Sequence, residues 1–213
     1  MNLFKQILII VVVLICDVFI VTYNYDTINT TTTCETCKII KPIILSEDKI
    51  NKKENIMLNQ ISKDKFKRIL IIYIKDISKI SDDKYILKVA EGYLDLLKMN
   101  PDKHSVLFYI SLCGVESHYN MKKINKGAIG ISQVIYSLHK KYISELGISK
   151  YNFFNSPKHN ILAGYMIWNS YFKNNGYNYK ISSYKYLGTR SDIYYYKILE
   201  NYFYLSNLII NEL

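Results

Sequence analysis

Apolar and polar positions divide the chain into an apolar N-terminal segment, a polar stretch without periodicity, and a long region of helical spacing. Residues 7–21 read ILIIVVVLICDVFIV, and the segment counted from residue 3 to residue 22 approaches the roughly 20 residues that a membrane-spanning helix needs. Asp17 interrupts it towards the C-terminal end, where a carboxylate can reach the membrane interface. We therefore expect residues 1–22 to form an uncleaved membrane anchor.

Two processed forms of this segment compete with the anchor. The uninterrupted apolar run ends at Cys16, as in a cleaved secretory signal, although no small-residue cleavage site follows. A lipoprotein signal ending at Cys16 is the third alternative, with bulky Ile15 standing where a small residue is usual. All three interpretations export the remainder of the chain.

Residues 23–45 are polar, contain four consecutive threonines, and read as a linker outside the membrane. Cys34 and Cys37 form a lone CxxC pattern in this linker, which in an exported chain favours a small local disulfide. A four-cysteine zinc site would need a second such pair, which the sequence lacks. Cys113 falls in a predicted helix, where it is expected to be a small core residue.

After the linker, apolar residues recur at three- and four-residue spacing, which predicts amphipathic helices. Residues 46–100 hold one or two such helices and then a helix over residues 82–99, which opens with two aspartates at the positive end of its dipole. Residues 101–213 form the expected main domain. Its predicted helices are residues 102–116, 132–146, 157–174, 178–187 and 191–208. No alternation strong enough for a sheet is present, so we predict an all-α, mainly helical fold.

Composition agrees with one helical core but leaves the partner open. The chain has 213 residues, only 3 Pro and 8 Gly, and a formal net charge of +10. Such a charge suits an anionic partner such as nucleic acid, lipid headgroups or an acidic polymer. The abundance of Lys, Ile, Asn and Tyr is also typical of an AT-rich genome, which explains the charge without any partner. Metal and nucleotide motifs are missing, so no metal and no cofactor is predicted.

Glu116 is the candidate for chemistry, because it closes an apolar helix and precedes a glycine-bearing loop. A carboxyl group at the edge of a core is desolvated, and its pKa rises towards neutrality. Such a group can donate a proton to a leaving oxygen and later take one back. Gln133, after the loop, offers both a donor and an acceptor for a sugar hydroxyl or amide.

The order of several short motifs resembles the lysozyme-like lytic transglycosylase family, specifically the catalytic domain of soluble lytic murein transglycosylases. The matching residues are Glu116-Ser117, then Gly127-Ala128-x-Gly130-x-x-Gln133, then Pro157-x-x-Asn160-Ile161-x-x-Gly164, and a looser Tyr/Gly segment that ends at Gly188. The resemblance covers about residues 105–204, roughly half of the chain. Each motif alone is modest, and three of them in order are fairly specific.

The resemblance implies that Glu116 cleaves the β-1,4 bond between N-acetylmuramic acid and N-acetylglucosamine in peptidoglycan, forming a 1,6-anhydromuramoyl end without consuming water. Gln133 and one of Tyr184 and Tyr186 are implied to position the glycan or Glu116. Ser117 is expected to support the end of the helix. The implied location is the periplasmic side of the membrane, with the apolar N-terminal helix as the membrane contact and peptidoglycan strands as the partner.

This sequence departs from the family pattern at several positions. Ser132 stands before the glutamine where the family usually has Met, and a serine usual before Gly-Ala is missing. Asn125 is the candidate to supply that polar contact. Ser156 interrupts the Asn-Pro pair, and the usual Tyr-Asn-x-Gly segment becomes residues 185–188, KYLG. These departures leave the acid in place and make the substrate contacts less defined.

Three other functions compete. A hydrolytic muramidase on the same fold would add water instead of closing the anhydro ring. A non-catalytic, membrane-anchored glycan-binding or envelope-assembly protein would keep the cleft without the reaction. Nucleic-acid binding by lysine-rich helices fits poorly with an exported chain, so no nucleic-acid partner is predicted.

Overall fold

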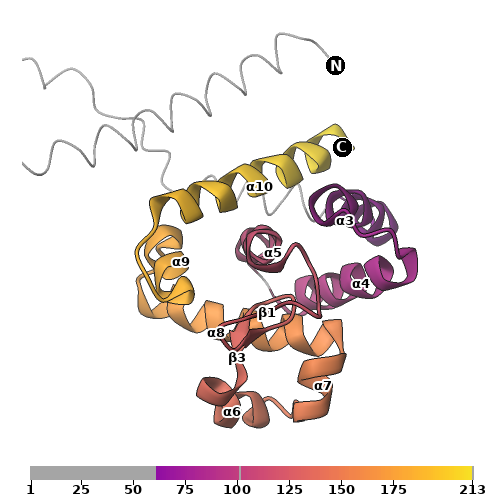
Figure 1. Ribbon diagram of the computed structural model, residues 1–213. Coiled ribbons are helices and arrows are strands. Elements are labelled where there is room, and N and C mark those ends of the chain that lie inside the picture. Colours follow the sequence, from indigo (N-terminus) through magenta and orange to yellow (C-terminus); the bar gives the residue numbers. More distant parts are fainter. Residues whose placement is uncertain (1–60, 101, 213) are drawn as a thin grey trace, which may run out of the picture. The chain divides into compact units, whose positions relative to one another are not determined.

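The computed structural model describes residues 61–100 and 102–212, and this part of the chain is mainly helical (Figure 1). The predicted all-α class is confirmed at this level. The helices are α3 (Lys63–Ser78), α4 (Asp83–Met99), α5 (Lys103–Ser117), α6 (Tyr136–Glu145), α7 (Lys150–Asn155), α8 (Pro157–Asn174), α9 (Tyr179–Leu187) and α10 (Asp192–Asn211).

Polar side chains begin most of these helices by accepting a hydrogen bond from a first-turn backbone N–H. Asp82 accepts from the N–H of Tyr85 at the start of α4, and Asn178 accepts from that of Ile181 at the start of α9. Pro157 instead occupies the first turn of α8, where its missing N–H costs nothing. These signals are local, and the predicted spans 157–174 and 178–187 agree with α8 and α9 within one residue.

Helix α5 lies at the centre of the main core. Its residues from Ser105 to Gly114 are all buried, as expected for a helix that is apolar all round. Figure 1 shows α3, α4, α8 and α10 arranged around it, and their apolar side chains form one continuous cluster with it. The two helices of residues 61–100 therefore share the core of the following region.

A second, smaller core lies beneath the glycine-bearing loop. Val134, Ile143, Phe153 and Ile167 are buried together there, on β3, α6, α7 and α8 respectively. Helix α8 contributes to both cores, so it joins the small core to the main one.

The loop itself corrects the expectation of no sheet. It forms an antiparallel three-stranded sheet of β1 (Ile124–Asn125), β2 (Ala128–Ile129) and β3 (Val134–Ile135), in the order β1-β2-β3. Strands of two residues are too short to show an alternating pattern, which explains why the sequence did not reveal them. A turn at residues 130–133 and then β3 precede the helix, so α6 begins at Tyr136 rather than at residue 132. The six-residue helix α7 was also not predicted, and α10 ends three residues beyond its predicted end.

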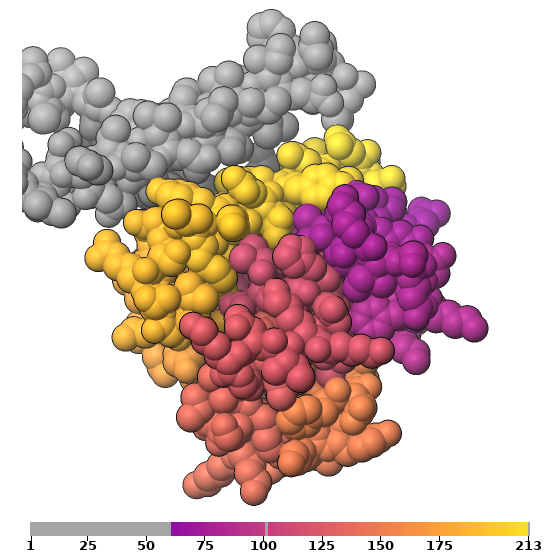
Figure 2. Space-filling view, viewed as in Figure 1, coloured from indigo at the N-terminus to yellow at the C-terminus, as the bar shows by residue number. Residues whose placement is uncertain are grey.

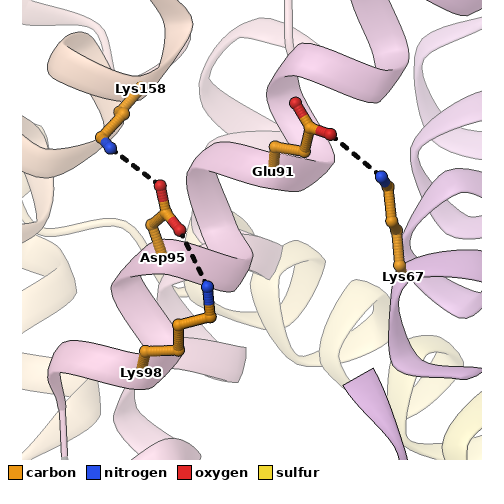
Figure 3. A network of polar contacts seen from close by, with 5 residues as sticks. All are labelled: Lys67, Glu91, Asp95, Lys98 and Lys158. Atoms are coloured by element: carbon orange, nitrogen blue, oxygen red, sulfur yellow. Dashed lines mark hydrogen bonds and ion pairs between the residues drawn. The ribbon is translucent and has the colours of Figure 1, made fainter. Parts of the chain in front are cut away.

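Ion pairs connect α4 to its two neighbouring helices (Figure 3). Lys67 on α3 lies 2.9 Å from Glu91, and Lys158 on α8 lies 2.8 Å from Asp95, which also pairs with Lys98. The side chains are substantially exposed, so each pair contributes little to stability. Two surface hollows, of about 300 and about 170 Å³, adjoin these pairs. Glu116 lines neither of them.

The predicted anchor (residues 1–22), the linker (23–45) with Cys34 and Cys37, and residues 46–60 lie outside the described residues. Within the described part, no helix has the length and apolar character needed to cross a membrane. Cys113 is a buried free cysteine, as predicted.

Candidate active site

Glu116 lies in the last turn of α5, where this buried helix reaches the surface of the core. Its side chain is partly buried. Burial raises the pKa of the Glu116 carboxyl to about 7, while a hydrogen bond from Tyr194 and the charge of Lys123 act in the opposite direction. A position at the negative end of the α5 dipole also disfavours the ionised carboxylate. The carboxyl is therefore poised to hold or release a proton near neutral pH.

Tyr194 is the residue that contacts this carboxyl, and it was not predicted. It lies in the first turn of α10, and its hydroxyl donates a hydrogen bond to Oε1 of Glu116. Ser191 fixes this turn by accepting a hydrogen bond from the Tyr194 N–H at 3.2 Å. Burial raises the pKa of Tyr194 well above its usual value, so the hydroxyl remains a donor at all physiological pH values.

The two predicted tyrosines occupy different surroundings. Tyr186 donates a hydrogen bond of 2.7 Å to the carbonyl of Ser132 in the glycine-bearing loop. Burial raises its pKa well above the usual value, and the negative charges of Cys113 and Glu116 add to this effect, whereas Glu116 does not affect the pKa of Tyr184. Tyr184 instead donates to Asp192, which also pairs with Lys180 at 2.8 Å. Of the two, Tyr186 is the one that the structure brings towards Glu116.

Gln133 holds the loop in shape. Its Nε2 donates to the carbonyl oxygens of Lys123 at 3.0 Å and of Gly130 at 2.9 Å. Its backbone has a φ of 50°, in the left-handed region that non-glycine residues rarely adopt. Both amide N–H groups are thus directed at the protein's own backbone, and the predicted contact with substrate is left to the Oε1 atom. The hydrogen bond from Gln133 Nε2 to the Lys123 carbonyl also fixes the backbone at Lys123, whose charge lowers the pKa of Glu116.

The predicted structural residues connect the end of α5 to the loop and to α8. Ser117 donates to the carbonyl of Ile131 at 2.7 Å, which agrees with its expected role at the helix end. Asn160 accepts from the Ser132 N–H at 3.0 Å through Oδ1, and its backbone carbonyl accepts from Ser132 Oγ at 3.0 Å. The motifs that lie far apart in the sequence therefore meet around Ser132.

Two of the predicted glycines are required by close packing. A Cβ on Gly130 would lie 2.5 Å from Nδ2 of Asn160, and Gly130 has a φ of 82°. A Cβ on Gly164 would lie 2.3 Å from both Ser132 Cβ and the hydroxyl oxygen of Tyr109. Glycine at position 164 thus allows α8 to approach the loop, which places Ser132 and Gln133.

The remaining predicted residues lie at turns or on the surface. Gly127 and Gly188 have φ values of 85° and 80°, and a Cβ on either would meet nothing within 4 Å. Gly188 ends α9 in the left-handed conformation, as helix ends commonly do. Asn125 is exposed on β1, where its partner across the sheet is Ala128. Its predicted contact with a ligand remains a prediction.

Residues 61–100 and 102–212 contain no group of three or more His, Cys, Asp or Glu side chains that could hold a metal ion. The histidines there include His104, which contacts Tyr179, and His159, whose Nδ1 lies 2.8 Å from Ser156 Oγ.

No family model matches the chain, and no curated protein or solved structure matches it either.

Proposed function

We propose that this chain is a peptidoglycan lytic transglycosylase that cleaves the β-1,4 bond between N-acetylmuramic acid and N-acetylglucosamine, with Glu116 as general acid and base. One observation carries the proposal. Glu116 is partly buried at a helix end, its pKa is raised to about 7, and the loop beside it is built from the glycine, serine, asparagine and glutamine residues of the motifs. A carboxyl group on an ordinary solvated helix end would keep its usual pKa, so the desolvation of Glu116 indicates a functional group.

The reaction needs two proton transfers by this carboxyl. Protonated Glu116 donates its proton to the glycosidic oxygen, and the bond from that oxygen to the muramyl anomeric carbon breaks. The acetamido group of the substrate stabilises the cationic carbon that forms. Ionised Glu116 then removes the proton from the O6 hydroxyl of the same sugar, and O6 bonds to the anomeric carbon. The carboxyl regains its proton, and no water is consumed.

Tyr194 and Lys123 favour the ionised form of Glu116, which the second proton transfer of this cycle requires. A hydroxyl that donates to Oε1 and a nearby ammonium both favour the carboxylate, so they partly offset the burial that favours the acid. A carboxyl balanced in this way can both release and recover a proton near neutral pH. Tyr194 also fixes the orientation of the carboxyl across α5 and α10.

The surroundings of Glu116 favour assistance by the substrate over a second enzymatic carboxylate. Among the described residues, Lys123 is the charged side chain that shifts the pKa of Glu116, and no acidic one contributes. Glycosidases that use two carboxylates hold them about 5–9.5 Å apart, close enough for such an influence. A substrate acetamido group removes the need for the second one.

We also propose a membrane tether and a periplasmic location for this chain. Residues 1–22 would tether the protein to the cell membrane and residues 23–45 would extend from it. The helical part, including the proposed catalytic region of residues 101–213, would then act on nearby peptidoglycan on the periplasmic side. The proposal needs no cofactor.

The test uses the purified full chain and its Glu116→Gln variant on isolated sacculi, with the released muropeptides identified by mass spectrometry. The parent protein should release products ending in 1,6-anhydromuramic acid, and Glu116→Gln should release them at least about 100-fold more slowly. Products with free reducing ends would identify a hydrolytic muramidase instead. Equal and negligible release by both proteins, with retained binding to sacculi, would identify a non-catalytic glycan-binding protein.

A further inference from the structure

The positive charge of the chain is concentrated in one contiguous segment. Residues 117–191 contain eleven lysines and arginines and a single acidic residue, Glu145. Residues 61–116 and 192–213 together contain eleven of each sign, and residues 1–60 contain six of each sign. The whole excess of +10 therefore belongs to residues 117–191. A bias in overall composition would have spread the excess along the chain.

The fold gathers this segment into one region, which we call the basic lobe: the three-stranded sheet and helices α6 to α9. The smaller hydrophobic core holds the sheet, α6, α7 and α8 together, and α9 packs on α8. Figure 2 shows the surfaces of the sheet region, α6 and α7 adjoining one another at the lower end of the view. The lobe thus presents its charge from neighbouring elements.

Most of these cations are not neutralised by the protein. Lys158 pairs with Asp95 and Lys180 pairs with Asp192. The other nine form no ion pair with any residue in the described part of the chain. They include exposed side chains before β1, in the turn between β1 and β2, and on α6 and α7, namely Lys122, Lys126, Lys140, Lys141 and Lys150. Like charges held together without partners cost free energy in the free protein, and an anionic partner removes that cost.

The lobe continues into the candidate active site. Lys123 belongs to the lobe, and its charge acts on the Glu116 carboxyl. The backbone of Lys123 is fixed by bonds from Gly130 and Gln133, so this part of the lobe is held rigidly beside Glu116. The lobe therefore includes a cation whose charge reaches the candidate catalytic carboxyl.

We propose that the basic lobe is a docking surface for the carboxylates of a wall polymer, namely those of the stem peptides carried by the peptidoglycan strand that Glu116 cuts. This identification of the polymer rests on the proposed function. Ten of the eleven cations are lysines, and Arg190 is the exception. Lysine ammonium groups attract carboxylates as flexible point charges, and the stem peptides of the proposed substrate carry carboxylates.

The experiment measures binding separately from cleavage. Full-length Glu116→Gln protein in non-ionic detergent is mixed with sacculi, which are pelleted at increasing salt. The test variant adds a change to glutamate at three exposed lysines of the lobe, Lys122, Lys126 and Lys140. The matched control adds the same change at three exposed lysines outside the lobe, Lys84, Lys88 and Lys197. Both triple variants remove the same net charge, and Lys123 is left intact because of its effect on Glu116.

The lobe variant should bind sacculi about tenfold more weakly, since three exposed pairs of up to about 1 kcal/mol each are lost, and the control should stay within about twofold. Sacculi whose carboxylates have been amidated should bind the parent as weakly as native sacculi bind the lobe variant. Equal weakening by both triple variants would overturn the proposal, because net charge alone would then explain binding. Unchanged binding to amidated sacculi would also overturn it.

Duplex DNA serves as a competing polyanion in the same assay. DNA is added until the protein leaves the sacculi. If this happens while the concentration of DNA phosphates is still below that of the sacculus carboxylates, nucleic acid is the preferred partner and the carboxylate assignment is overturned. The outcome is independent of the proposed reaction. If the lysines of the lobe are needed for binding but the parent protein releases no muropeptides, the proposed enzyme is refuted and the docking surface stands. If the parent protein releases muropeptides but binding does not depend on these lysines, the docking surface is refuted and the proposed enzyme stands.

Discussion

The hydroxyl of Tyr194, in the first turn of α10, donates a hydrogen bond to Oε1 of Glu116, in the last turn of α5. These residues are 78 positions apart in the sequence, and the packing of α10 against α5 brings them together. The contact favours the ionised carboxyl, whereas the burial of Glu116 favours the protonated one. The protonation of Glu116 is therefore set by two opposing effects that can be altered separately.

Removing the Tyr194 hydroxyl should raise the pKa of Glu116. Tyr194→Phe removes a hydrogen bond that stabilises the carboxylate, worth about 1.5–3 kcal/mol, so the pKa should rise by about one to two units. The alkaline limb of kcat/KM reports loss of the proton from the free enzyme, and it should move to higher pH by that amount. Sacculus digestion followed across pH measures it.

The control for this change is Tyr184→Phe. The Tyr184 hydroxyl donates to Asp192 and makes no contact with Glu116, so its removal should leave the alkaline limb in place. Equal shifts in both variants would mean that the limb reports something other than the Tyr194 contact.

Burial of Glu116 should make the parent protein less stable relative to Glu116→Gln as pH rises. The carboxyl has a pKa of about 7 in the folded state and a lower ordinary value of 4.5, so the folded state binds more protons between these values. Stability therefore falls with rising pH in this window, by an amount on the order of 3 kcal/mol. Glu116→Gln removes this titration.

Urea unfolding of both proteins at pH 4.5 and at pH 8 measures the effect. The stability of Glu116→Gln relative to the parent should increase from the lower to the higher pH. A difference that is constant across this range would show that the Glu116 carboxyl has its ordinary pKa in the folded protein.

Gly164→Ala should destabilise the fold and disrupt the loop. The added Cβ would lie 2.3 Å from the Cβ of Ser132 in the loop and from the hydroxyl oxygen of Tyr109 on α5. Either α8 or these neighbours must therefore move. Overpacking of this kind costs about 1–3 kcal/mol. Gly92→Ala is the comparison in α4, where the nearest atoms are the end of the Ile161 side chain at 3.0 Å and the Lys158 Cα at 3.2 Å.

Urea unfolding should show a larger loss for Gly164→Ala than for Gly92→Ala, because the added Cβ would lie 2.3 Å from its nearest atoms at position 164 and 3.0 Å from its nearest atom at position 92. A smaller loss at position 164 would contradict the close packing of α8 on the loop.

The sequence was sufficient for the helices whose ends carry local signals. Asp82 at the start of α4 and Pro157 in the first turn of α8 are such signals, and both helices end as predicted. The short sheet was missed because its pairing depends on the backbone of Gln133 and Gly130 and on contacts with Asn160, which no local pattern encodes.

The desolvation of Glu116 was predictable from the sequence, whereas its hydrogen-bond partner was not. Glu116 stands at the end of an apolar helix, and that position alone implied desolvation, which agrees with its raised pKa. Tyr194 was missed because it is one of 21 tyrosines and its contact depends on how α10 packs on α5. The structure shows the amide N–H groups of Gln133 bonded to the loop backbone, which the sequence did not indicate, and its contact with substrate stays a prediction.

Digestion of sacculi in water enriched in ¹⁸O tests the central claim most directly, because the fate of the anomeric carbon separates attack by O6 from attack by solvent. The account predicts that the parent chain releases anhydromuramyl products without solvent-derived ¹⁸O, and that Glu116→Gln releases almost none. Incorporation of one ¹⁸O atom at each new reducing end, or undiminished release by Glu116→Gln, would contradict it.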